Sequence, residues 1–196
     1  MKTTGRQLFS IFEFYQIMTL AFRSMPLLRR AKAAGSMNHA FLERIMLAVT
    51  EVNGCAMCSY FHTKVALEAG FPAEEIRNML GGDFADVPAD ELEGVLFAQH
   101  YADLRGKPSR ECWERIVTTY GETGAYGVLA VTRMIMLGNA VGIPSGSFLN
   151  RFRKRRDPRS NLFYELMMLL ALLVFPLPAG VTALAQHVLN VPILSF

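Results

Sequence analysis

A run of apolar residues at helical spacing, between Met37 and Val52, determines the class of fold that this chain adopts. These side chains recur three and four residues apart, so they line one face of an α-helix. They are Phe41, Leu42, Ile45, Met46, Ala48, Val49 and Val52. Elsewhere the sequence lacks the sustained apolar and polar alternation that is typical of half-buried strands. The pattern therefore predicts an all-α protein.

Glycine, proline and serine residues divide the rest of the chain into further helices. The dipeptide Asn53-Gly54 predicts a break, and a new helix is expected over residues 55–69, closed by Gly70. The apolar segment 8–22 is expected to end as a helix near Pro26. Similar start and stop signals predict helices over 72–80, 88–104, 109–120 and 123–140. Together these segments predict a bundle of six or seven helices.

Composition and length predict one main domain with extensions at both ends. The chain has 196 residues, of which 52% are hydrophobic and 19% charged, so it is able to bury a substantial core. We expect an apolar helical extension over residues 1–36 and a helical core over residues 37–150. Residues 151–196 are expected to form a basic linker followed by an apolar helical tail.

The tail differs from the rest of the chain in charge. Residues 151–196 hold six Lys and Arg against two acids, a balance of +4, which leaves −1 for residues 1–150. The near-neutral main body gives no sign of a nucleic-acid partner. Leu166 to Ala185 is uncharged and long enough to cross a bilayer core of about 30 Å as a helix. Pro176 and Pro178 interrupt that stretch.

Two interpretations of the tail stay open on sequence grounds. In the first, the basic cluster stays on the cytoplasmic side and the apolar segment spans or re-enters a membrane. In the second, the segment is a short helix that covers an apolar face of the domain or of a neighbouring subunit. Glu13 and Gln16 interrupt the apolar N-terminal stretch and disfavour a cleaved signal peptide. The sequence thus predicts a cytoplasmic protein whose tail is a candidate membrane contact.

The stretch "NGCAMCSYFH" carries the strongest chemical signal in the chain. On a helix, Cys55, Cys58 and His62 are three and four residues apart, so all three lie on one face. A helix N-terminus stabilises a thiolate, and a C-x-x-C pair closes readily into a disulfide. The pattern indicates a reversible dithiol/disulfide cycle with His62 as base. Either Glu43 or Glu51, on the preceding helix, is a candidate to orient that histidine.

Other chemistries for these residues are less well supported. A zinc site would take Cys55, Cys58 and His62 and would need a fourth ligand such as Cys112 or His100. Two inert buried thiols beside an incidental histidine are a further alternative. Cys112, His39, His100 and His187 have no surrounding cluster and are interpreted as structural. We expect no metal and no organic cofactor.

The residues from Glu43 to Ile76 also resemble a known family motif. A glutamate, eleven residues, C-x-x-C, three residues and a histidine, followed by "TKVALEAG", resemble the alkylhydroperoxidase (AhpD-like) branch of the carboxymuconolactone decarboxylase family. The likeness is weaker through "LGNAVGIP" and covers neither the first thirty residues nor those after about Pro144. It implies an AhpD-like helical bundle that forms trimers, hexamers or larger rings with the dithiol near a subunit interface.

The resemblance also implies roles for individual residues. Cys58 is the expected peroxidatic nucleophile, Cys55 the resolving cysteine, and His62 with Glu43 the proton relay. The implied function is reduction of a hydroperoxide, with an external thiol or dithiol reductant restoring the cysteines. The best-known peroxidase members carry a second histidine between the cysteines, where this chain has Met57.

Two alternative functions remain beside the peroxidase. One is a membrane-associated redox switch or scaffold that uses the same dithiol without turnover. The other, a lactone decarboxylase, is less well supported because members with that activity lack the dithiol and resemble this chain in fold only.

Overall fold

The computed structural model describes residues 8–153 and 157–196. In these residues it shows eight helices and no strand, which confirms the predicted all-α fold. The helices are α1 (Ile11–Ala33), α2 (His39–Asn53), α3 (Ala56–Glu68), α4 (Ala73–Leu80), α5 (Ala89–Asp103), α6 (Arg110–Arg151), α7 (Leu162–Val174) and α8 (Pro176–Val188).

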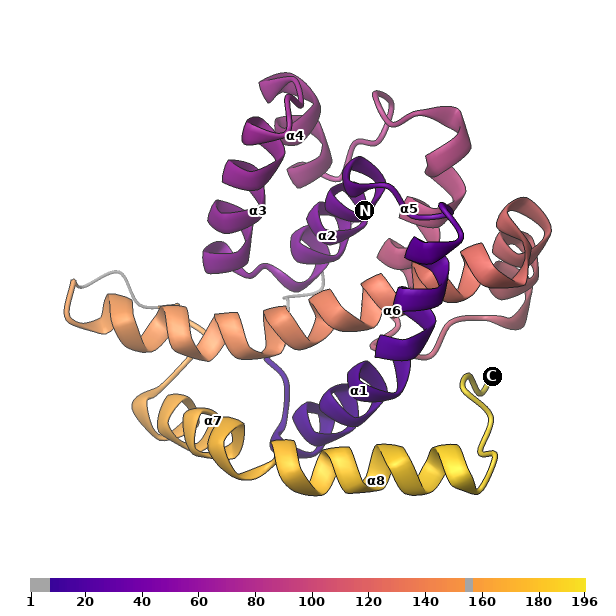
Figure 1. Ribbon diagram of the computed structural model, residues 1–196. Helices are drawn as coiled ribbons and strands as arrows, with labels where there is room; N and C mark the ends of the chain where they lie inside the picture. The colour runs from indigo at the N-terminus through magenta and orange to yellow at the C-terminus, as the bar shows by residue number, and fades with distance from the viewer. Residues whose placement is uncertain (1–7, 154–156) are drawn as a thin grey trace.

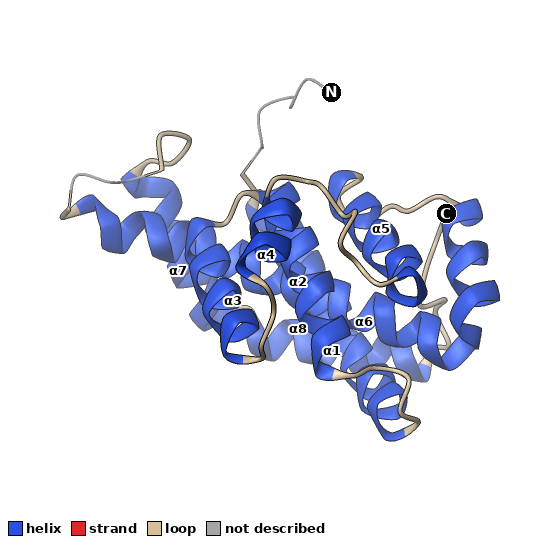
Figure 2. Cartoon of the chain, turned by 90° about the horizontal axis from the view of Figure 1, so that it is seen from above, coloured by secondary structure: helices blue, strands red, loops and turns tan. Residues whose placement is uncertain are grey.

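The long helix α6 is the centre of the molecule (Figure 1). It packs most extensively against α1 and also contacts α2, α3, α5 and α7. Helices α2 and α3 lie on one side of α6 and α7 and α8 on the other, and α1 crosses between α6 and α8 (Figure 1). Figure 2 shows the same helices from above, joined by short loops. Because α6 contacts five other helices, its different faces pack against different parts of the molecule.

Local capping explains where α2 and α3 begin and end. The side chain of Asn38 accepts a hydrogen bond from the backbone N–H of Phe41 and starts α2. Gly54 ends α2 in the left-handed region at φ 64°, which glycine adopts without strain. Cys55 then caps α3 through its sulfur, which accepts from the N–H of Cys58. The first cysteine of the motif is therefore also the N-cap of its helix.

Two predicted helix ends are wrong, one near Pro26 and one at Ala140. Helix α1 continues through Pro26 to Ala33, and α6 continues past Ala140 and through Pro144 to Arg151. Buried residues lie on both sides of each proline, so packing outweighs the one backbone hydrogen bond that proline removes. The predicted break between residues 120 and 123 does exist within α6, because Gly121 is non-helical at φ 68° and ψ 172°.

The tail is two helices that pack on the rest of the fold. Helices α7 and α8 are bent by 57° at a break before Pro176. Helix α7 packs on α6, and α8 packs on α1. Lys154, Arg155 and Arg156 of the predicted basic linker lie outside the described residues.

One buried carboxylate holds α7 in place. Glu165 on α7 has a fully buried side chain and accepts hydrogen bonds from Arg151, Ser147 and Ser160. Burial raises the pKa of Glu165, but the three hydrogen-bond donors together lower it by more. The pKa of Glu165 therefore lies below its ordinary value. The ionised carboxylate is thus the link between α7 and the end of α6.

Two stretches in the described part of the chain meet the length and composition of a membrane span. One is α6, of whose most apolar window 72% is buried inside the protein, as in the core helix of a soluble protein. The other is the bent pair of α7 and α8. Membrane contact by the tail therefore depends on the surface that α7 and α8 expose, and not on α6.

Candidate functional site

The turn at Gly54 brings all four predicted site residues together. It carries the chain from α2 into α3, which packs against α2, so the first turns of α2 face the middle of α3. Glu43 and His62 meet there, and the carboxylate Oε2 lies 2.9 Å from the imidazole Nδ1. Both side chains are buried, with 7% of the Glu43 side chain and 10% of the His62 side chain exposed. Of the two glutamates left open by spacing, the contact to His62 is made by Glu43.

The hydrogen bond to Glu43 fixes the role of each ring nitrogen of His62. An ionised carboxylate only accepts hydrogen bonds, so Nδ1 donates its hydrogen to Glu43. The neutral ring then carries its lone pair on Nε2, which has no partner among the described residues. The arrangement leaves His62 able to exchange a proton with a molecule at Nε2.

Cys55 and Cys58 form a disulfide in this structure, with their Cα atoms 5.3 Å apart. The two cysteines differ in their access to solvent. Cys55 is 1% exposed, and its sulfur accepts from the backbone N–H of Cys58 at 3.2 Å. Cys58 is 8% exposed. Of the two cysteines, Cys58 is therefore the more exposed.

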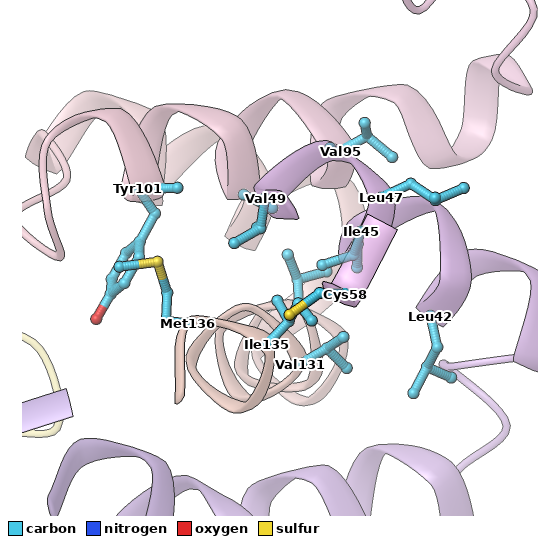
Figure 3. Close-up of a cluster of buried hydrophobic side chains, with 14 of the residues drawn as sticks. Leu42, Ile45, Leu47, Val49, Cys58, Val95, Tyr101, Val131, Ile135 and Met136 are labelled. Carbon is cyan, nitrogen blue, oxygen red and sulfur yellow. The ribbon is translucent and has the colours of Figure 1, made fainter. Parts of the chain in front are cut away.

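Helix α6 forms the wall opposite the dithiol. A Cβ atom built on Gly142 would lie 2.5 Å from the Cys58 sulfur and 2.7 Å from the Cys55 sulfur, too close for a real side chain. One turn earlier, the carbonyl oxygen of Gly138 lies 3.6 Å from the Cys58 sulfur, where it can accept a hydrogen bond from the reduced thiol. Glycine at 142 thus lets the helix backbone reach the sulfurs. Figure 3 shows Cys58 beside Ile135 and Val131 of α6.

An apolar groove of about 470 Å³ opens over this wall. It is lined by Met57, Cys58, Phe61, His62, Met134, Ile135, Leu137, Gly138, Val141 and Gly142. Cys58 and His62 are the polar or reactive side chains among them, whereas Cys55 and Glu43 lie behind and do not line the groove. A molecule in the groove would thus meet the Cys58 sulfur and the His62 ring together.

Sequence reasoning missed the contribution of α6 to the site. The segment "LGNAVGIP" shows only a weak family resemblance in sequence, yet it supplies Gly138 and Gly142, the two glycines that contact the dithiol. The available signal was the spacing of Gly138, Gly142 and Gly146, which places three small residues on one face of a helix. Gly146 also faces the neighbouring helix, because its own Cβ would lie 3.2 Å from that of Met57.

Cys112 and His100, the other candidate ligands, lie at the start of α6 and near the end of α5, outside the groove over the dithiol. Cys112 is partly buried on α6, and its backbone N–H donates to Ser109, whose own N–H donates to Nε2 of His100. Across residues 8–153 and 157–196, no three His, Cys, Asp or Glu side chains are grouped so as to hold a metal ion.

Fold and site together define an all-helical protein that carries a C-x-x-C disulfide beside a buried Glu-His pair, over an apolar groove. Residues 21–92 match the model of the carboxymuconolactone decarboxylase family, and this segment contains Glu43, Cys55, Cys58 and His62. The match confirms the resemblance for this segment at the level of the family. No curated protein and no solved structure matches the chain significantly.

Proposed function

We propose that this protein is a dithiol peroxidase of the alkylhydroperoxidase-like branch of its family, reducing organic hydroperoxides. One observation carries the proposal: Cys58 and His62 open onto the same apolar groove, while Cys55 lies buried behind the first and Glu43 behind the second. This is the order expected of a nucleophile and proton donor in front, with a resolving thiol and an orienting carboxylate in support.

The proposed reaction has two steps. The Cys58 thiolate attacks the outer oxygen of the hydroperoxide, the O–O bond breaks, and the products are a sulfenic acid on Cys58 and an alcohol. The Cys55 thiol then attacks the Cys58 sulfur, forming the disulfide and releasing water. An external dithiol returns two electrons and two protons. The disulfide seen in this structure corresponds to the state before that reduction.

His62 and Glu43 supply the proton transfers in this cycle. The lone pair on Nε2 accepts the thiol proton of Cys58, and the protonated ring gives it to the departing alkoxide. Glu43, 2.9 Å from Nδ1, stabilises the positive charge that the ring carries between these events. Met57 stands where the best-known peroxidase members have a second histidine, and its thioether, 48% exposed at the groove, transfers no proton. The proposed proton relay of this chain therefore consists of His62 and Glu43.

The walls of the groove favour a substrate with an apolar body. Phe61, Met134, Leu137 and Val141 surround the position where a molecule would approach Cys58. Hydrogen peroxide would leave this surface unused, whereas an alkyl hydroperoxide would bury its chain against it. We therefore expect a hydroperoxide with an alkyl or aryl group to react faster than hydrogen peroxide.

Exposed apolar side chains also occur on α3 and at the end of α6, and we propose that they form an interface between copies of the chain. Met57, Tyr60 and Phe61 on α3 are 48%, 77% and 59% exposed, and Leu149 and Phe152 at the end of α6 are 61% and 81% exposed. Exposed apolar surface that is grouped in this way marks association sites when it is contiguous, which is the basis of the proposal. Light scattering after size exclusion tests the expected trimer or hexamer. A monomer at all concentrations refutes it.

Stopped-flow consumption of cumene hydroperoxide by the reduced protein tests the peroxidase. We expect Cys58→Ser to abolish the fast phase and Glu43→Gln to slow it by about 10- to 100-fold. Cys112→Ser is the matched control, because it removes a partly buried thiol outside the groove and should react like the wild type. A wild type no faster than Cys58→Ser refutes the peroxidase and leaves the dithiol as a redox switch.

A second candidate role, contact with a membrane surface, rests on the outer faces of α7 and α8. Their large exposed apolar side chains are Leu162, Phe163, Leu166, Leu170, Leu173, Val174, Leu177, Val181, Leu184 and Val188. No charged residue occurs between Leu166 and Ala185, and the exposed Arg153 precedes them. We propose that this face lies against an anionic lipid surface.

Flotation with vesicles of phosphatidylcholine and phosphatidylglycerol tests the membrane contact. The wild type should float with the vesicles, and a Leu173→Ser, Leu177→Ser double variant should float much less. Leu67→Ser, which removes an exposed leucine from α3, is the control and should float like the wild type. A wild type that stays with the unbound protein refutes the contact.

A further inference from the structure

A second pocket, of about 300 Å³, shares no lining residue with the groove over the dithiol. Its walls come from α1, α5, α6, α8 and the residues next to them, including Phe9, Tyr101, Lys107 and Ser195. Much of this wall belongs to segments outside residues 21–92, the part of the chain that matches the family. The pocket is therefore built largely by the extensions at the two ends of the chain.

The unusual feature of this pocket is a buried arginine without an acidic partner. Arg133 on α6 is 3% exposed. Its Nε donates to the Tyr101 hydroxyl at 2.9 Å. Its Nη1 donates to the Ser24 hydroxyl at 3.2 Å, and its Nη2 to the carbonyl of Ile193 at 2.8 Å. All three acceptors are neutral, and within the described residues no carboxylate forms an ion pair with this guanidinium.

The other charges of the pocket do not neutralise Arg133. The one carboxylate that lines the pocket, Glu13, forms an ion pair with Arg105 at 2.6 Å. Lys107 is exposed at the edge of the pocket and makes no ion pair with a described residue. The lining thus carries three cations and one carboxylate.

A further arginine adds positive charge beside the pocket. Arg23 bonds only neutral acceptors, which are Gln186 and the carbonyls of Val191 and Pro192. Burial and, next, the positive charge of Arg133 lower the pKa of Arg23. The two guanidinium groups therefore repel each other, and the hydrogen-bond acceptors of both, among the described residues, are neutral.

A buried charge without a counter-charge is costly, since burial removes water that would otherwise solvate it. An anion in the pocket would remove that cost by pairing with the Arg133 side chain. The Tyr101 hydroxyl would help, because it accepts from Arg133 while its own hydrogen has no acceptor among the described residues. Phe9, Ile17, Leu20 and Met136 supply apolar walls, and Figure 3 shows Met136 beside the Tyr101 ring.

We propose that this pocket binds a small carboxylate with an apolar body, its carboxylate on Arg133 and Tyr101 and its body against the apolar walls. A carboxylate matches the planar guanidinium, and the volume, at the lower end of ligand sites, suits a medium-chain acid. The site is independent of the dithiol chemistry. Its ligand is bound through charge and shape, without any covalent step.

Isothermal titration of the full chain with octanoate tests the site. We expect saturable binding of one octanoate per chain. Acetate should bind more weakly than octanoate because it has no apolar body, and 1-octanol should bind more weakly because it has no charge. Arg133→Met, which replaces the guanidinium by an unbranched apolar side chain, should weaken octanoate by about 10- to 100-fold. Lys107→Gln should weaken it by about 2- to 5-fold, because Lys107 is exposed and screened.

Lys32→Gln is the matched control, since it removes an exposed lysine that does not line the pocket. It should bind octanoate like the wild type. Absence of saturable binding in the wild type, or equal affinity in the wild type and Arg133→Met, overturns the proposal. If the Arg133→Met chain does not fold, Lys107→Gln is compared with Lys32→Gln, and equal affinity of these two overturns it.

Discussion

Replacing Gly142 by alanine tests how closely α6 approaches the dithiol. In the interior of a helix, glycine to alanine ordinarily stabilises by about 0.5–1 kcal/mol. At Gly142 the new methyl would lie 2.5 and 2.7 Å from the sulfurs of Cys58 and Cys55. Non-bonded atoms prefer separations of roughly 3.5–4 Å, so α3 or α6 would have to shift by about 1 Å. Such overpacking costs about 1–3 kcal/mol. The net expectation is a loss of about 0.5–2 kcal/mol.

Gly138→Ala is the matched control for this experiment, because it makes the same change one turn earlier on the same helix. The nearest atom to its Cβ would be Cδ1 of Ile135 at 3.5 Å, an ordinary contact, and Gly138 is exposed. It should gain the helix-propensity term of about 0.5–1 kcal/mol. Urea unfolding of both variants under oxidising conditions measures the difference. A Gly142→Ala chain as stable as Gly138→Ala would refute the close approach.

Two further predictions concern ion pairs that hold helices together. Arg105 hydrogen-bonds Glu13 and holds its pKa at about 2, below the ordinary 4.5, so the stability from this pair is present above pH 4.5 and is lost as the pH falls through about 2. Glu13→Gln should cost about 1 kcal/mol at pH 7, allowing for side chains that are about one third exposed, and urea unfolding should show this cost shrink as the pH falls toward 2. Glu165→Ala should cost about 2–4 kcal/mol and expose α7 to limited proteolysis, because it leaves Arg151 without its carboxylate. Equal stability of wild type and Glu13→Gln at pH 7, or unchanged proteolysis of α7, would contradict these two predictions.

Local signals in the sequence were sufficient for the helices around the dithiol. Gly54 and Ser109 act within a few residues of their own position, so the break and the helix start expected there follow from the sequence and the structure reproduces them. The contact between Glu43 and His62 required one more piece of information, the family motif, because both Glu43 and Glu51 lie on α2 and helical spacing alone does not separate them.

Features that depend on contacts between distant segments could not be predicted in this way. The end expected near Pro26 was wrong because packing against neighbouring helices overrides a local breaker, and the end expected at Ala140 was wrong because buried residues continue through Pro144. In the sequence, Arg133 is indistinguishable from an ordinary polar residue of a helix. It is buried because α1, α5 and the C-terminal residues pack around it. The contact of Gly142 with the sulfurs likewise joins positions more than eighty residues apart.

The packing around the disulfide also predicts which sulfur moves when it is reduced. Two bonded sulfurs lie about 2.05 Å apart, whereas two thiols need roughly 3.5–4 Å. Gly142 closes one side, and Cys55 is held at 1% exposure as the N-cap of α3, so the free space lies on the groove side of Cys58. Reduction should therefore bring the Cys58 sulfur further into the groove.

Alkylation of the reduced protein by a limiting amount of iodoacetamide measures this difference. Peptide mass spectrometry should find Cys58 modified well before Cys55, and the same order is what attack by Cys58 on a hydroperoxide requires. Cys112 gives an internal reference for a partly buried thiol outside the groove. Faster modification of Cys55 would assign the attacking role to the N-cap cysteine, and the proposed order of the two steps would then have to be reversed.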